Sequence, residues 1–256
     1  MRSDAMDRLR RDFLIQDLEE AARDCDIDGT IAVQARQTIE ETAWLCKLAE
    51  QDPFILGIVG WAPLTSPDLD SVLDQIAHPK LKAVRHVLHD EPDDLYMLRR
   101  DFNRGISRLH SRSLSYDILI LERHLSQTIK FVDRHPNQVF VVDHIAKPRI
   151  KEDILSPWEE NLTELARREN VYCKVSGMVT EADHRLWTPE QLQPYFDVVI
   201  ECFGPSRLMF GSDWPVLTLA SSYRDWVWAF RRFVARLTPD EQRQIGSETA
   251  RAAYRL

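Results

Sequence analysis

Short apolar segments alternate with amphipathic helical patterns along the whole chain of 256 residues. The helical patterns place apolar residues three and four positions apart, as at Leu125, Ile129 and Val132. Strands that are apolar on both faces and separated by helices form a parallel sheet covered by helices. The pattern therefore predicts an α/β fold, either an open doubly wound sheet or a closed barrel. The seven predicted strands are residues 30–34, 54–60, 81–86, 116–121, 139–142, 171–175 and 207–210.

Acidic and histidine side chains that follow two of these strands favour the barrel. Asp213, in the segment Gly-Ser-Asp-Trp-Pro, follows the strand at 207–210, and His144 follows the strand at 139–142. Side chains just past the carboxyl ends of the strands line the active site of a (β/α)₈ barrel. Asp213 is therefore a candidate base, metal ligand or substrate anchor. The alternative is that the polar residues before Pro215 only cap a turn.

The length and charge of the chain narrow the class of protein. The length is close to the roughly 250 residues of one barrel, so we expect a single domain over residues 1–256. The formal net charge is −8 and basic residues form no long block, which argues against a nucleic-acid partner and favours a small-molecule substrate.

The sequence contains neither an apolar run of about 18 residues nor a signal peptide. We therefore expect a cytoplasmic protein without a membrane partner. The four cysteines are scattered without CxxC spacing, which predicts neither a disulfide framework nor a zinc knuckle.

A closed barrel of this class has eight strands, and the sequence predicts seven. The first eleven residues are rich in arginine and aspartate and contain no β-branched residue, so they do not supply a buried strand. The missing strand is therefore the first one. Its absence exposes the edges of the strands at 30–34 and 207–210, and exposed edges invite association. We expect a homo-oligomer or aggregation through this gap.

Five motifs together resemble the amidohydrolase-related branch of the amidohydrolase superfamily, which includes hydrolases of L-fuconolactone and L-rhamnonolactone. The resemblance implies a distorted TIM barrel that hydrolyses a sugar lactone or a similar cyclic ester. The motifs are Leu-Arg-Arg-Asp-Phe at 9–13, Lys-Ala-Val-Arg-His-Val at 82–87, Asp-His-Ile-Ala-Lys-Pro at 143–148, Asn-Val-Tyr-Cys-Lys-Val-Ser-Gly at 170–177 and Met-Phe-Gly-Ser-Asp-Trp-Pro-Val at 209–216.

The resemblance also implies roles for individual residues. Asp213 matches the aspartate after the last strand that activates the hydrolytic water, and His144 matches the strand-end histidine in the middle of the barrel. Arg85 and Lys174 match positions from which cationic side chains face the substrate pocket. Trp214 is a candidate sugar-stacking wall, with packing as the alternative.

One motif of the family is absent from this sequence. Members begin with a strand that carries Asp-x-His-x-His, and no His-x-His occurs here. We interpret this as a truncated amino terminus, in agreement with the strand count. Only His144 and Asp213 remain of the ligand set, and catalytic zinc normally has three protein ligands. We therefore expect no cofactor, and at most weak binding of a divalent metal such as zinc; stoichiometric zinc would overturn this expectation.

These observations favour a hydrolase homologue of the metal-dependent type, in which water activated by Asp213 opens a sugar lactone or a similar cyclic ester. Two alternatives remain open. The first is a catalytically impaired, truncated homologue that only binds a ligand. The second is a decarboxylase of the same superfamily, because these enzymes also carry a histidine and an aspartate at strand ends.

Overall fold

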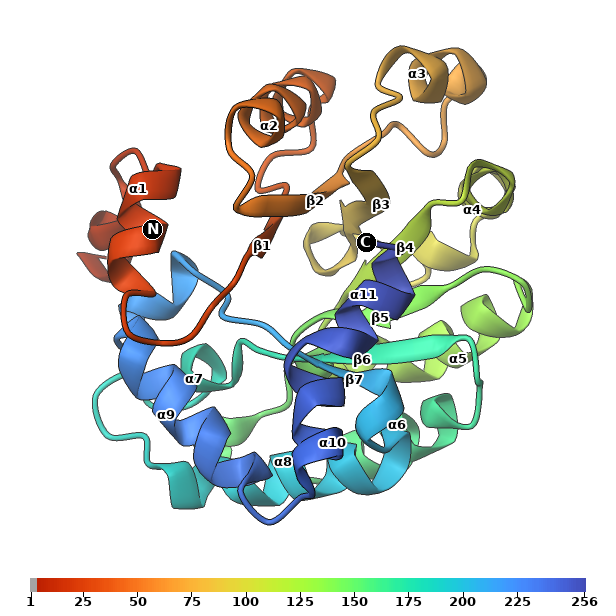
Figure 1. Cartoon of the computed structure of the whole chain (residues 1–256). Coiled ribbons are helices and arrows are strands. Elements are labelled where there is room, and N and C mark those ends of the chain that lie inside the picture. The colour runs from red at the N-terminus through yellow and green to blue at the C-terminus, as the bar shows by residue number, and fades with distance from the viewer. Residues whose placement is uncertain (1–3) are drawn as a thin grey trace.

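The computed structural model describes residues 4–256 of the chain. Its strands are β1 (Thr30–Val33), β2 (Ile55–Gly60), β3 (Leu81–Val87), β4 (Ser115–Leu119), β5 (Phe140–Val142), β6 (Val171–Val175) and β7 (Leu208–Phe210). They form one sheet in sequence order, and every neighbouring pair is parallel (Figure 1). The predicted α/β architecture is confirmed, and each predicted strand lies within two residues of an observed one.

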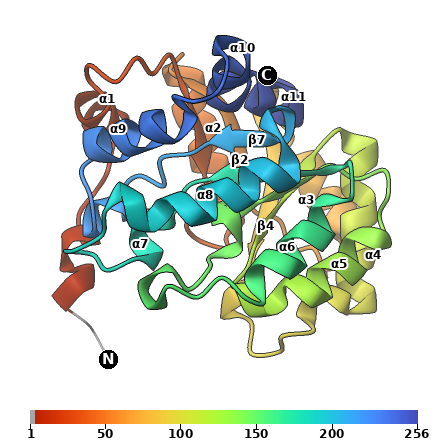
Figure 2. The ribbon, with the colours of Figure 1, turned by 90° about the horizontal axis from the view of Figure 1, so that it is seen from below.

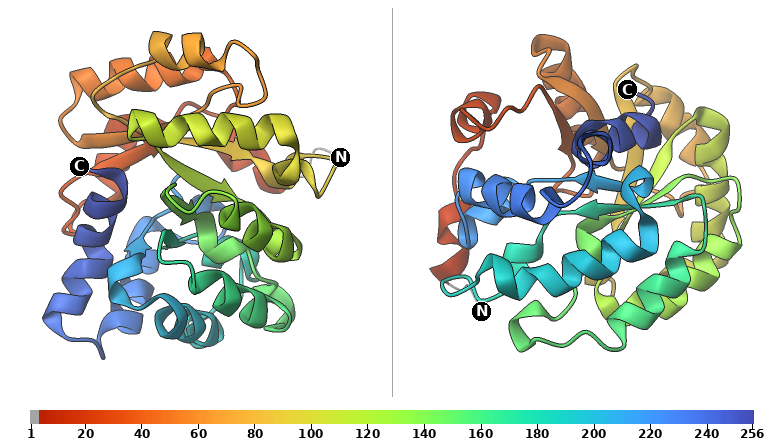
Figure 3. Two further views of the ribbon diagram at one scale, coloured as in Figure 1. Left: turned by 90° about the vertical axis from the view of Figure 1, so that its right-hand side faces the viewer. Right: turned by 60° about the horizontal axis from the view of Figure 1, so that its bottom comes forward.

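Helices pack around the curled sheet (Figure 3). The helices of the described residues are α1 (Ile15–Ala21), α2 (Ile39–Gln51), α3 (Leu69–Gln75), α4 (Arg100–Leu109), α5 (Leu125–Asp133), α6 (Trp158–Ala166), α7 (Met178–Glu181), α8 (Pro189–Phe203), α9 (Tyr223–Val234), α10 (Pro239–Arg243) and α11 (Thr249–Tyr254). Of these, α5, α6 and α8 lie side by side (Figure 2). The hydroxyl groups of Thr38 and Thr188 cap the amino ends of α2 and α8, and Gly204 ends α8 with a φ of 65°.

The two faces of the sheet build two apolar cores. On the outer face, Phe140 and Val142 belong to the large core between the sheet and the helices. On the inner face, Val141 and Met209 belong to a smaller core that also contains Tyr254 of α11. Successive side chains of a strand point to opposite faces, so β5 contributes to both cores in turn. The carboxyl-terminal helix thus fills one end of the barrel interior.

The sheet is open, because β1 and β7 each pair with a single strand among residues 4–256. The seven strands are one fewer than in a closed barrel, and the described residues before β1 form a 3₁₀ helix (Asp4–Leu9) and α1. The two free edges that the sequence predicted are therefore present, while association through them stays a prediction. No helix in the described part of the chain combines the length and the apolar character that crossing a membrane requires.

Candidate functional site

Asp213 and His144 meet at the carboxyl edge of the sheet. His144 follows β5, Asp213 follows β7, and Nε2 of His144 lies 3.7 Å from Oδ1 of Asp213. Both side chains are nearly buried, with 10% and 13% of their surface exposed. The structure therefore brings together the two residues that the sequence proposed as catalytic, and their catalytic role stays a prediction.

The backbone around this pair has an uncommon conformation. Four consecutive residues, 144–147, have left-handed φ angles of 52°, 47°, 61° and 49°, and Asp213 has a φ of 57°. A left-handed residue other than glycine costs about 1–2 kcal/mol, so the surrounding structure has to hold these turns in place. The indole of Trp158 does so by donating a hydrogen bond of 2.7 Å to the carbonyl of Ile145. Conformational strain of this kind is typical of functional sites.

Ser176 and Gly177, which follow β6, fix the imidazole of His144. Nδ1 of His144 lies 2.8 Å from Oγ of Ser176. Gly177 has a φ of 66°, and a Cβ atom added there would lie 2.8 Å from the imidazole ring. The ring is therefore held by a hydrogen bond and packs closely against a residue that must be small.

Gly177→Ala is therefore expected to displace the imidazole of His144. A Cβ atom at 2.8 Å overlaps the ring, and the positive φ adds strain, so we expect a loss of about 1–3 kcal/mol in the free energy of unfolding. The matched comparison is the same substitution in a His144→Ala background, where the backbone strain is unchanged and the ring that the added Cβ atom overlaps is absent. Denaturant unfolding measures the loss caused by Gly177→Ala in both backgrounds, and equal losses would show that the overlap with the ring of His144 is irrelevant.

Burial shifts the pKa values of the two site residues in opposite directions. It raises the pKa of the Asp213 carboxyl to about 7 and lowers the pKa of the His144 imidazole to about 3. His144 is therefore neutral near pH 7, while Asp213 titrates there. A neutral imidazole can bind a metal or accept a hydrogen bond, and a carboxylate that titrates near pH 7 can act as a general base.

Below this pair, four charged side chains form a buried layer across the barrel, here called the charged layer: Arg85 of β3, Asp117 of β4, Asp143 after β5 and Lys174 of β6. Nη1 of Arg85 and Nζ of Lys174 lie 2.9 and 2.5 Å from the two carboxylate oxygens of Asp143. Lys174 also lies 3.1 Å from Asp117. Both cations predicted to face a substrate are thus paired with carboxylates inside the barrel, and their contact with substrate stays a prediction.

The two carboxyl groups of the charged layer differ in their titration. Burial alone would raise the pKa of Asp143, but the adjacent Lys174 and Arg85 hold it well below its ordinary value. Burial raises the pKa of Asp117 to about 6, although Lys174 opposes the shift. Asp143 is therefore ionised at every pH at which the protein would be assayed, whereas Asp117 changes its charge within that range.

Trp214 follows Asp213, and its indole packs edge-on against Phe13, with ring centroids 5.3 Å apart. The packing alternative thus has a specific contact, whereas sugar stacking stays a prediction.

Three residues of this region were not among those predicted from the sequence: Asp117, Ser176 and Gly177. Asp117 was hidden in the apolar run 116–121, where an acidic residue was itself a signal, because a buried carboxylate needs a partner. Ser176 and Gly177 come directly after a predicted strand, and His144 and Asp213 likewise lie within three residues of the ends of theirs.

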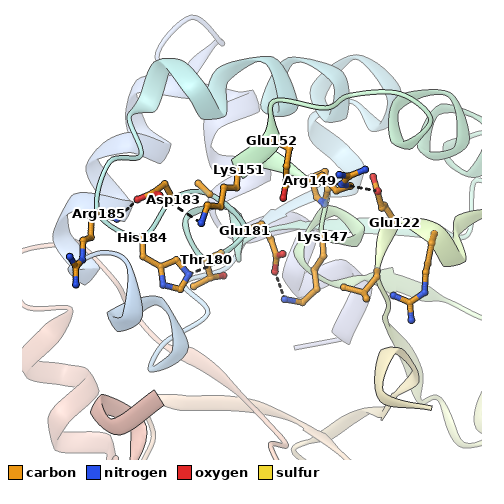
Figure 4. Close-up of a pocket in the computed structure, with 14 residues that line it drawn as sticks. Glu122, Lys147, Arg149, Lys151, Glu152, Thr180, Glu181, Asp183, His184 and Arg185 are labelled. Atoms are coloured by element: carbon orange, nitrogen blue, oxygen red, sulfur yellow. Dashed lines mark hydrogen bonds and ion pairs between the residues drawn. The ribbon is translucent and has the colours of Figure 1, made fainter. Parts of the chain in front are cut away.

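A cleft of about 600 Å³ opens beside the pair and is bounded by the loop after β5 and by α7 (Figure 4). Its wall contains Lys147 and Glu181, whose side chains form an ion pair of 2.5 Å. Neither His144 nor Asp213 lines the cleft, but Lys147 is three residues from His144 and donates its backbone N–H to the carbonyl of His144. The Lys147–Glu181 pair therefore lies on the wall of the cleft next to the loop that carries His144.

Comparison with known proteins identifies relatives. The amidohydrolase family model matches residues 1–256. L-fucono-1,5-lactonase of Burkholderia multivorans is 37% identical over 259 residues, which cover 97% of this chain and 88% of the relative. The enzyme of the same name from Burkholderia ambifaria is 34% identical, over 98% of this chain and 88% of its own length. The crystal structure of an amidohydrolase from Burkholderia multivorans with bound zinc superimposes with a TM-score of 0.96 at 37% identity, covering 99% of this chain and 92% of that one.

The zinc in that structure contradicts the expectation that this chain uses no metal. The expectation rested on the small number of remaining ligands, because His144 and Asp213 are two and catalytic zinc normally has three protein ligands. Zinc bonds of about 2.0–2.2 Å place two tetrahedral ligands about 3.4 Å apart. His144 and Asp213, at 3.7 Å, are close to this separation. They are the donors available for one ion here, since no cluster of three or more His, Cys, Asp or Glu side chains within residues 4–256 is placed to hold a metal.

Proposed function

The chain belongs to the amidohydrolase family, and from this premise we propose that it opens a sugar lactone, with Asp213 as the base that activates the attacking water. The observation that carries the proposal is the convergence of Asp213 and His144, 3.7 Å apart, at the carboxyl ends of parallel strands. Relatives that are more than 30% identical over nearly the whole chain bear the name L-fucono-1,5-lactonase, which favours a sugar lactone as the substrate.

Lactone opening requires a nucleophilic water, a polarised carbonyl and a proton for the leaving ring oxygen. In the metal-free protein, burial raises the pKa of Asp213 to about 7, so its carboxylate is basic enough to take a proton from water and its acid form is strong enough to return that proton to the leaving alkoxide. One residue thereby serves both proton transfers. The carbonyl carbon gains the water oxygen, and the ring oxygen leaves as a hydroxyl group.

His144 and Asp213 are the residues that we propose as ligands of a divalent ion. Such an ion, when bound, supplies a Lewis acid that polarises the carbonyl. Burial keeps His144 neutral, and a proton on Nδ1 facing Ser176 leaves the lone pair of Nε2 free on the side of Asp213. The hydroxyl oxygen of Ser176 can accept that proton, which is compatible with the tautomer that metal binding requires. We propose Arg85, Lys174 and Trp214 as further residues of the substrate pocket.

An assay of acid release tests the proposal. Purified protein is mixed with a panel of aldonolactones and a pH indicator, beside the variants Asp213→Asn and Asp28→Asn. Asp28 is exposed, so its variant is the matched control for the loss of one carboxylate. Hydrolysis by the wild type and by Asp28→Asn, but not by Asp213→Asn, supports the proposal. Binding of lactones without hydrolysis would support a protein that only binds its ligand, and release of carbon dioxide from a carboxylic acid would support a decarboxylase.

A further inference from the structure

The carboxyl-terminal helix is tied directly to the charged layer. The hydroxyl of Tyr254, in α11, donates a hydrogen bond of 2.7 Å to Oδ2 of Asp117. Ser115, two residues before Asp117 in β4, donates a hydrogen bond of 2.7 Å to the carbonyl of Ala253. In Figure 1, α11 is the dark blue helix that lies over the strands near β4. Tyr254 is 1% exposed, so its hydroxyl is committed to this contact.

Asp117 reaches the site through Lys174. Nζ of Lys174 is shared between Asp117, at 3.1 Å, and Asp143, at 2.5 Å. Asp143 directly precedes His144 in the chain. A Cβ atom added to Gly211 would lie 3.0 Å from Cγ of Lys174, so Lys174 packs tightly beneath the residue that comes two positions before Asp213. The location of the ammonium group is therefore coupled to both residues of the site.

We propose that Tyr254 is a positioning residue, whose hydroxyl fixes Asp117 so that Asp117 and Asp143 together hold the ammonium group of Lys174 beneath His144 and Asp213. This inference rests on the proposed function, because it assigns a role in that reaction. Tyr254 touches no reacting atom and acts through Asp117. The helix that closes one end of the barrel thereby affects the opposite end.

The groups that face Asp117 determine how the loss of the Tyr254 hydroxyl changes the pKa of Asp117. They are Arg85 on the neighbouring strand β3, Asp143 after β5, Lys174 of β6 and Tyr254 of α11. The hydrogen bond from Tyr254 stabilises the ionised form of Asp117, so its removal raises the pKa of this carboxyl. A protonated Asp117 no longer neutralises Lys174. The effect on the site is therefore larger at pH 6 than at pH 8, where Asp117 is ionised in either case.

Tyr254→Phe tests the inference, because it removes the hydroxyl and keeps the ring in the inner core. We expect kcat/KM for the lactone to fall about 10-fold at pH 6 and less than about 2-fold at pH 8. Tyr116→Phe is the matched control: Tyr116 precedes Asp117 in β4, but its ring lies on the other face of the strand, among Phe102 and Phe131. We expect it to leave the pH profile unchanged.

A second measurement does not depend on catalysis. In protein labelled with ¹³C at the aspartate carboxyl groups, the signal of Asp117 is assigned by its loss in Asp117→Asn. We expect this signal to titrate at a higher pH in Tyr254→Phe than in the wild type. Should the wild type open no lactone, the proposed function fails, and this titration still decides whether Tyr254 controls Asp117. An unmoved titration, or a loss of kcat/KM that is the same at pH 6 and pH 8, overturns the inference.

Discussion

Asparagine in place of Asp213 is expected to lower kcat for lactone opening by about 10³-fold or more, because a positioned general base contributes about 10²–10⁴-fold. Asparagine preserves the shape of the side chain but cannot accept the proton of the attacking water. KM should change far less than kcat, since the same substitution leaves the cleft and the charged layer intact. Steady-state kinetics with the best aldonolactone of the panel measure both constants, and a variant that retains more than a tenth of the wild-type kcat would exclude Asp213 as the base.

The same substitution is expected to stabilise the fold in chelator-treated protein above pH 7. Burial raises the pKa of Asp213 from an ordinary value near 3.8 to about 7, so the folded state holds a proton that the unfolded state has lost. The stability associated with this group is complete below pH 4 and is lost as the pH rises through 7. At pH 8, Asp213→Asn should therefore raise the free energy of unfolding by about 2–4 kcal/mol, and at pH 4 by much less. Urea unfolding at both pH values checks the sign.

The strands and the two strand-end residues could be predicted from sequence because their signals are local. Apolar runs of four to seven residues marked the strands, and parallel strands bring their carboxyl ends to one edge, so Asp213 and His144 had to lie near each other. The partners of the buried cations could not be predicted in this way. Asp117 binds Lys174 of a strand two places away and Tyr254 at a separation of 137 residues. Such contacts depend on strand register and on the docking of a six-residue helix that carries no pattern of its own.

The expectation about the metal failed for a different reason. Two protein ligands, His144 and Asp213, were expected to bind zinc weakly at most, because catalytic zinc normally has three. A relative that is 37% identical contains zinc, and the geometry of His144 and Asp213 accommodates two bonds to one ion. Ligands from β5 and β7 are 69 residues apart in sequence, from 144 to 213, so no spacing rule applies to them. The strand topology decides which donors meet.

Asp143→Asn is expected to cost about 3–5 kcal/mol of folding stability, the largest structural effect in the charged layer. Asp143 is fully buried and pairs with both Arg85 and Lys174, so its neutral replacement leaves two buried cations with Asp117 as the remaining carboxylate of the layer. Its two cationic neighbours hold the pKa of Asp143 below its ordinary value, so the stability that it confers is present above about pH 4 and is lost only as the pH falls below that value.

Asp117→Asn is the matched comparison, because it makes the same change in the same layer at a carboxyl whose pKa is about 6. A raised pKa means that ionised Asp117 contributes less to stability as the pH rises, so its replacement should cost clearly less than that of Asp143 at both pH 5 and pH 8. Urea unfolding of the two variants at these pH values measures the difference. Equal losses would show that Arg85 and Lys174 do not depend mainly on Asp143, and that Asp117 contributes as much as Asp143 to the stability of the charged layer.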